Sequence, residues 1–195
     1  MTSRFFSTLA TLFAAAFFLS GCSDSGAPAA GKAGSTPVTI GAISAGATGF
    51  TVGSPMSART VYVFFDAQCP HCGALWYAAK PLKSQAKFVW IPVGLLNGAS
   101  TSQGATLLAA ADPSAAMDQH EASLMSKGGG ISAGSNIDAQ KEAIAKNTAL
   151  MNSFGIASIP TIIGTHAQTG EVVKQEGAMP TAALANLLGL QVPAQ

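Results

Sequence analysis

The sequence predicts an α/β fold in which strands and helices alternate along the chain. Two runs, residues 60–65 and 87–93, consist mainly of β-branched, aromatic and other apolar side chains, as do strands that are buried on both faces. Residues 70–79 between them have apolar side chains at helical spacing, and the stretch 102–154 also has helical periodicity. The predicted order is therefore strand, helix, strand, helices, strand, strand, helix.

The segments around the first buried strand predict a hairpin before it and a helix after it. Residues 38–43 and 50–52 are apolar or alternating and are separated by glycines, which is typical of a small hairpin. After the strand, Pro70 fits the first turn of a helix, where a missing N–H is tolerated. Pro81 should kink that helix.

The second half of the chain predicts a helical insertion followed by a hairpin and a last helix. The insertion covers about residues 98–154 and lies between the second and third core strands, with Asp112 capping one of its helices. Residues 159–163 start a new strand, which pairs with residues 172–173 across a tight turn. The last helix covers residues 181–188 and stops at a glycine.

The N-terminus predicts an exported protein. Arg4 followed by the apolar residues 5–19 is typical of a secretory signal peptide, since 15 apolar residues are fewer than the roughly 20 of a spanning helix. Residues 19–22 (Leu-Ser-Gly-Cys) resemble the lipobox of bacterial lipoproteins, which implies cleavage before Cys22 and lipid attachment to it. The alternative is an ordinary signal peptide with an incidental cysteine. Ser23 follows the lipid site, so the outer membrane is preferred to the inner one.

These features divide the chain into three parts. Residues 1–21 are the predicted signal peptide, residues 22–36 a Gly-, Ala-, Ser- and Pro-rich tether, and residues 37–195 the folded domain. Without Arg4, the chain has nine basic and nine acidic side chains, and no block of lysine and arginine stands out. Nucleic-acid binding is not expected, because phosphate contacts need clustered positive charge.

The cysteines favour redox chemistry over a structural role. If Cys22 carries lipid, Cys69 and Cys72 remain, and a disulfide between them would close too small a loop to stabilise the fold much. A zinc site needs two more ligands, whereas His71, His120 and His166 are scattered. We therefore expect neither a metal nor a cofactor.

A resemblance to a known family supports this interpretation. A buried strand ending in Phe-Phe-Asp66, then Cys69-Pro-His-Cys72 opening a helix, then a helical insertion, then Ile159-Pro160-Thr before a hairpin resembles the catalytic domain of DsbC and DsbG, most of all DsbG. These are periplasmic disulfide isomerases, and the similarity covers about residues 59–189. It implies a thioredoxin-like fold and thiol–disulfide interchange.

The resemblance has two departures. Only residues 22–58 precede the catalytic strand, so we do not expect the family's separate dimerisation domain or its V-shaped dimer. The pair Pro70-His71 is the one found in the oxidase DsbA, whereas DsbG has Pro-Tyr, which leaves the direction of the reaction open.

The roles of the motif residues follow from thiol chemistry. Only a thiolate attacks a disulfide, and Cys69 at a helix N-terminus should have a pKa within roughly 3.5 to 7.5. Cys72, one turn later, should be more buried and resolve the mixed disulfide. Pro70 and His71 should tune the pair; the alternative is that His71 is merely an exposed loop residue.

A second element, Ile159-Pro160, is expected beside the cysteines. The resemblance implies a cis bond that lets the backbone of Ile159 pair with an extended client by strand addition. The alternative is a trans proline that starts an edge strand.

Other residues are weaker candidates. Asp66 should cap the active-site helix rather than shuttle protons, and Val63 occupies the place of the buried acid of thioredoxin. Trp76 should belong to the core. Asp118, His120 and Glu121 suggest a metal cluster only on paper, so we place these three on the solvated face of a helix.

Three functions remain open from the sequence. The first is a DsbG-like isomerase or reductase, kept reduced by a DsbD-like membrane partner, and the second is a DsbA-like oxidase, kept oxidised by a DsbB-like one. Both would act on exported proteins that contain cysteines. The third is a non-catalytic client-holding or copper-chaperone role, since copper(I) favours thiolates.

Overall fold

The computed structural model describes residues 36–194. The strands are β1 (Phe50–Gly53), β2 (Thr60–Asp66), β3 (Lys87–Val93), β4 (Thr161–Thr165) and β5 (Val172–Glu176). The helices are α1 (Ile40–Gly46), α2 (Pro70–Ala79), α3 (Gly98–Ala109), α4 (Pro113–Met125), α5 (Asp138–Ser153) and α6 (Thr181–Leu188). The predicted signal peptide, the lipid site at Cys22 and nearly all of the tether lie outside the described residues.

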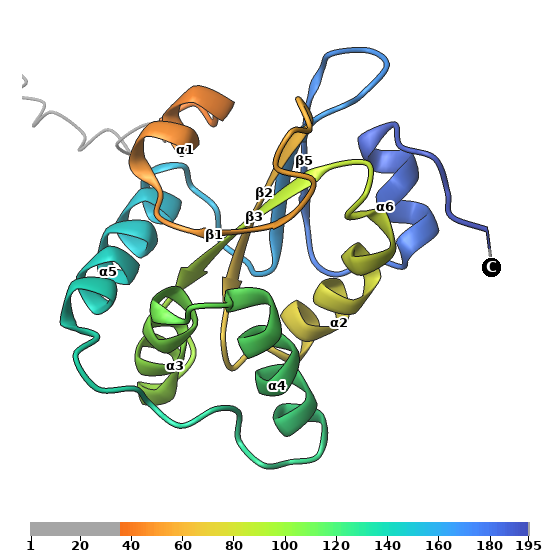
Figure 1. The fold of residues 1–195 in the computed structure, drawn as a ribbon. Helices are drawn as coiled ribbons and strands as arrows, with labels where there is room; N and C mark the ends of the chain where they lie inside the picture. The colour runs from red at the N-terminus through yellow and green to blue at the C-terminus, as the bar shows by residue number, and fades with distance from the viewer. Residues whose placement is uncertain (1–35, 195) are drawn as a thin grey trace, which may run out of the picture. The chain divides into compact units, whose positions relative to one another are not determined.

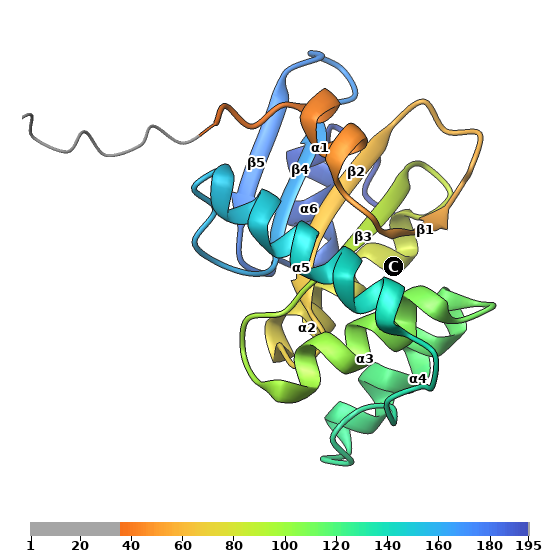
Figure 2. The same cartoon turned by 90° about the vertical axis from the view of Figure 1, so that its left-hand side faces the viewer.

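The five strands form one mixed sheet in the order β1-β3-β2-β4-β5. The two strands with continuous apolar runs, β2 and β3, are parallel neighbours near the centre, and the other pairings are antiparallel. Helices cover both faces, with α2 and α6 on one side and α1 and α5 on the other (Figures 1 and 2). This arrangement confirms the predicted α/β order and explains why β2 is buried on both faces.

Aromatic packing fixes α2 against the sheet. Trp76 of α2 meets Trp90 of β3 edge to face, with ring centroids 5.0 Å apart, and Trp90 meets Phe65 of β2 at 5.6 Å. All three side chains are buried. The prediction that Trp76 belongs to the core is confirmed, and the packing holds the helix that carries the cysteines.

The predicted hairpin at the start of the domain is wrong. Residues 40–46 form α1, and the Thr39 hydroxyl caps it by accepting a hydrogen bond from the Ala42 N–H at 3.1 Å. Ile43 is the fully buried residue of this helix and packs with β2 and α5. One buried residue in seven gives too little periodicity to distinguish a short helix from a strand.

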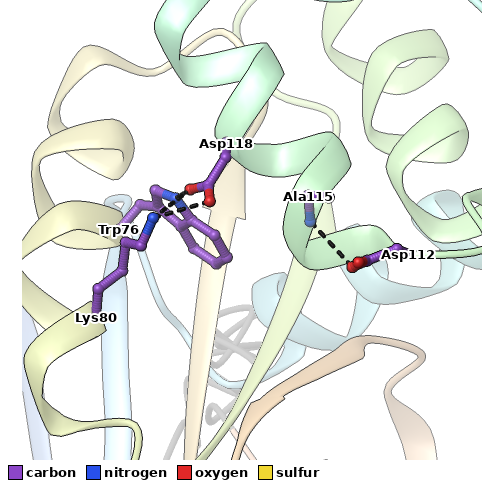
Figure 3. A network of polar contacts seen from close by, with 5 residues as sticks. All are labelled: Trp76, Lys80, Asp112, Ala115 and Asp118. Carbon is purple, nitrogen blue, oxygen red and sulfur yellow. Dashed lines mark hydrogen bonds and ion pairs between the residues drawn. The ribbon is translucent and has the colours of Figure 1, made fainter.

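The helical insertion lies between β3 and β4 as predicted and contains α3, α4 and α5. Asp112 caps α4, where its carboxylate accepts a hydrogen bond from the Ala115 N–H at 3.0 Å (Figure 3). The last helix, α6, has the predicted bounds and ends at Gly189 with a φ of 65°. Pro81 does not kink α2 but lies in a 3-10 turn, Lys80–Leu82, that follows it.

The insertion is bound to the active-site helix. Asp118 of α4 accepts hydrogen bonds from the Trp76 indole N–H and from the Lys80 ammonium, both at 2.7 Å (Figure 3). This contact places α4 directly beside α2. Within residues 36–194, no helix is long and apolar enough to cross a bilayer.

Candidate active site

The two cysteines lie where β2 leads into α2. Cys69 is the N-cap residue of α2, with extended backbone angles, and Pro70 occupies the first helical position. Cys72 is one turn later, and its N–H donates to the Cys69 carbonyl at 3.0 Å. Both cysteines are thiols in this structure; Cys69 is 5% exposed and Cys72 is fully buried. Cys69 is therefore the more accessible of the two sulfurs.

Local hydrogen bonds favour the thiolate form of Cys69. The Cys72 thiol donates to the Cys69 sulfur, and this bond is the largest cause that lowers the pKa of Cys69 to about 6, although burial opposes it. The backbone N–H groups of Cys72 and His71 and the charge of His71 lower the pKa further. At neutral pH, Cys69 is thus mainly a thiolate, the form that attacks disulfides.

Cys72 has the opposite chemistry. Burial, the hydrogen bond that it donates to Cys69 and the negative charge of Cys69 raise the pKa of the Cys72 thiol far above its usual range. Cys72 therefore keeps its proton while Cys69 is ionised. This asymmetry suits a nucleophile followed by a resolving thiol.

The Ile159-Pro160 element lies beside the cysteines. The Ile159 carbonyl oxygen is 3.9 Å from the Cys69 sulfur, and the Ile159–Pro160 bond is cis, as the resemblance implied. Pro160 is buried and leads into β4, which pairs with β2. The structure thus brings Cys69, Cys72, Ile159 and Pro160 together, while Pro70 and His71 are exposed on the first turn of α2.

Asp66 does not have its predicted role. The N-cap of α2 is Cys69, without a side-chain capping bond, and Asp66 is fully buried. One carboxylate oxygen accepts from the Gln68 N–H at 2.8 Å, and the other accepts from the Leu95 and Leu96 N–H groups at 2.7 and 3.0 Å. Asp66 therefore ties the loop before Cys69 to the loop after β3.

The prediction of a solvated face is also wrong for His120, which is fully buried. One ring nitrogen contacts the Ala67 carbonyl, and the other accepts from the Ile131 N–H at 3.1 Å. Burial lowers the pKa of His120, so the neutral form is favoured, with the proton on the nitrogen that faces Ala67. His120 connects α4 to the loop that precedes Cys69.

Glu121 is a site residue that the sequence reasoning missed. Its side chain is 2% exposed and lies against Gly73, which follows Cys72, and its Oε1 has no hydrogen-bond partner in the described part of the chain. Burial and the negative charge of Cys69 raise the pKa of Glu121 to about 7. The buried Met117 lies one helical turn before Glu121, and this spacing could have placed the residue on the inner face of α4.

The described residues contain no group of three or more histidine, cysteine, aspartate or glutamate side chains that could hold a metal. The arrangement of Asp118, His120 and Glu121 agrees with that finding, because each has different surroundings. Asp118 pairs with Lys80, His120 bonds to backbone groups, and Glu121 faces Gly73.

Comparison with known proteins assigns the family. Residues 54–191 match the thioredoxin-like domain. The chain belongs to the thioredoxin-like family. Within this family it is 34% identical over 134 residues to the thiol:disulfide interchange protein DsbG of Pseudomonas aeruginosa, a match that covers 67% of this chain and 51% of the relative. The chain therefore spans about half the length of the curated relative that it matches.

Solved structures have the same thioredoxin-like fold. A periplasmic thioredoxin-like protein from Salmonella enterica serovar Typhimurium superposes with a TM-score of 0.60 at 16% identity, covering 79% of this chain and 97% of that one. The thiol-disulfide exchange protein alpha-DsbA2 from Wolbachia pipientis gives 0.57 at 20% identity, covering 76% and 93%. The α/β thioredoxin-like fold with a helical insertion is thus confirmed.

Proposed function

We propose that this chain is an exported thiol–disulfide oxidoreductase that exchanges disulfides with proteins through Cys69 and Cys72. The observation that carries the proposal is the pairing of an acidic Cys69, with a pKa of about 6, and a buried Cys72 thiol that donates a hydrogen bond to it. The similarity to a protein named thiol:disulfide interchange protein supports it.

The exchange proceeds in two steps. The Cys69 thiolate attacks one sulfur of a client disulfide, so that a mixed disulfide forms and the other client sulfur leaves as a thiolate. Cys72 then loses its proton and attacks the Cys69 sulfur, which releases the second client sulfur and leaves a Cys69–Cys72 disulfide. The client gains two electrons and two protons as it becomes a dithiol. In isomerisation, the released client thiolate instead attacks a second disulfide of the client, and the thiolate set free there attacks the client sulfur of the mixed disulfide. This forms a new client disulfide and releases Cys69 as a thiolate.

The preferred direction is isomerase or reductase, in the manner of DsbG, with a DsbD-like membrane partner that restores the dithiol. The similarity to DsbG supports this direction. The second candidate is an oxidase kept oxidised by a DsbB-like partner. It is favoured by the low pKa of Cys69, because a stabilised thiolate makes the reduced form more stable and the disulfide more oxidising.

Clients are proposed to bind along the Ile159-Pro160 element. The half-buried Ile159 has its carbonyl 3.9 Å from the Cys69 sulfur, so an extended client that pairs with this backbone would bring its disulfide to the nucleophile. The clients are then exported proteins with cysteines. The proposed location of the protein rests on the predicted signal peptide and the predicted lipid site at Cys22. We expect the protein in the periplasm, held by a lipid anchor and preferably at the outer membrane.

Two experiments test the function. In a refolding assay with a protein whose disulfides are scrambled, Cys69→Ser should abolish exchange, and Cys72→Ser should accumulate mixed disulfides. Full activity of Cys69→Ser would overturn the assignment of the nucleophile. Alkylation of the two thiols in intact cells then separates the directions: a mostly reduced pair contradicts the oxidase, and a mostly oxidised pair contradicts the isomerase.

The anchor has its own test. Cys22→Ser should release the protein into the soluble periplasmic fraction, whereas the wild type should sediment with membranes. If the variant still sediments, lipid at Cys22 is not what holds the protein.

A further inference from the structure

A cavity of about 340 Å³ opens beside the active site, between α2 and α4. Its α2 wall includes Pro70, Ala74 and Tyr77, and its α4 wall includes Leu124 and Met125. Pro70 directly follows the nucleophile Cys69, so the cavity begins next to the reacting sulfur. Met125 is 73% exposed and Tyr77 is 38% exposed, so the lining of the cavity includes apolar side chains that are open to solvent.

One side chain in this mainly apolar lining is ionisable. Glu121 lines the cavity and is 98% buried by the rest of the protein, with an exposed fraction of 2%. Its Oε1 has no hydrogen-bond partner in the described residues, although buried polar atoms are nearly always paired. Gly73 allows the carboxyl group to approach, because a Cβ at this position would collide with the Glu121 Oε2.

Within the described residues, no cationic side chain pairs with this carboxyl group. No lysine or arginine belongs to the described residues that line the cavity. Lys80, in the 3-10 turn after α2, is held by both oxygens of Asp118, at 2.7 and 2.8 Å. A ligand that brings a cation and several donors would therefore satisfy Glu121, and an aliphatic stem would match the apolar walls.

We propose that this cavity receives a basic side chain of the client, lysine or arginine, that lies next to the cysteine attacked by Cys69. The aliphatic part of the side chain packs between Tyr77 and Leu124, and its charged end donates to the carboxyl group of Glu121. The proposal rests on the proposed function and adds a preference for sequences around the client cysteine.

The test uses two peptides, each with one cysteine in a mixed disulfide with glutathione. They differ in the residue next to the cysteine, which is lysine in one and norleucine, an uncharged side chain with a similar stem, in the other; a second pair has this residue on the other side. The reduced full-length protein should consume the lysine peptide about tenfold faster in at least one pair, the effect expected of one charge-assisted hydrogen bond. Equal rates in both pairs would overturn the cavity proposal alone, whereas no exchange with any peptide would overturn the proposed function as well.

Variants then locate the preference. Glu121→Gln should reduce the lysine-to-norleucine rate ratio to about one, and the ratio cancels any change in the reactivity of Cys69 itself. Asp118→Asn, which removes a carboxylate from the same helix outside the cavity, should keep the ratio of the wild type. If Glu121→Gln does not fold, Ala74→Leu narrows the cavity from an exposed position and should also lower the ratio. A preference that survives in the folded variants refutes the assignment to this cavity.

Discussion

Replacing Cys72 by alanine should raise the pKa of Cys69, because the Cys72 thiol donates the hydrogen bond that lowers this pKa most. A hydrogen bond to a charged group contributes about 1.5–3 kcal/mol, and one pKa unit corresponds to about 1.4 kcal/mol. The pKa should therefore rise from about 6 by roughly one to two units, to between about 7 and 8. At pH 7, the ionised fraction of Cys69 would fall from about nine tenths to between about one half and one tenth.

The assay is a pH titration of the reduced proteins that follows the ultraviolet absorbance of the thiolate, with the rate of alkylation as a second measurement. Cys72→Ser is the matched control, because a hydroxyl group can donate the same hydrogen bond and should keep the pKa closer to that of the wild type. If Cys72→Ala titrates with the wild-type pKa of about 6, the bond from Cys72 is not the main cause. The helix terminus and the backbone N–H groups would then have to account for the whole effect.

Three further predictions follow from the same site. In the reduced protein, the lowered pKa of Cys69 should add stability that is present above the ordinary thiol pKa and is lost as the pH falls through about 6. In denaturant unfolding, the free energy of unfolding of the wild type should therefore exceed that of Cys69→Ser by more near pH 9 than at pH 5. A difference that does not change with pH would contradict this. Cys69→Ser should lower the pKa of Glu121 below about 7, because the negative charge of Cys69 is one of the two causes that raise it. Infrared titration of the carboxyl group measures this, and an unchanged carboxyl titration would refute the coupling. Asp66→Ala should lower the free energy of unfolding by about 2–4 kcal/mol, because three backbone N–H groups lose their acceptor. Chemical denaturation measures this, with Asp138→Ala at an exposed site as the control. If the two variants are equally stable, the role of Asp66 is contradicted.

The elements that sequence reasoning predicted well are those with strong local signals. The apolar runs of β2 and β3 specify buried strands, and the pair Asp112-Pro113 marks the start of α4. Gly189, with its positive φ, marks the end of α6. The positions of Cys69 and Cys72 also follow, because proline after Cys69 favours a helix start at that point.

The errors at the candidate site concern residues whose surroundings come from distant parts of the chain. His120 and Glu121 are polar, so the sequence favoured the solvated side of α4, but α2 and the loop before Cys69 cover them. The acceptor role of Asp66 depends on Leu95 and Leu96, some 30 residues later, and no local pattern indicates it. Helical spacing from Met117 was the one signal available for Glu121.

The bond between His120 and the Ala67 carbonyl gives the inserted helix a direct hold on the loop that carries the nucleophile. Any substitution that shifts α4 will therefore move the carbonyl two residues before Cys69, as well as the carboxyl group of Glu121. The reactivity of Cys69 can thus be altered from a part of the chain more than 40 positions away, with both cysteines and the dipeptide between them left intact. For protein engineering, substitutions in α4 are a way to change the redox properties of the cysteine pair without changing the pair itself.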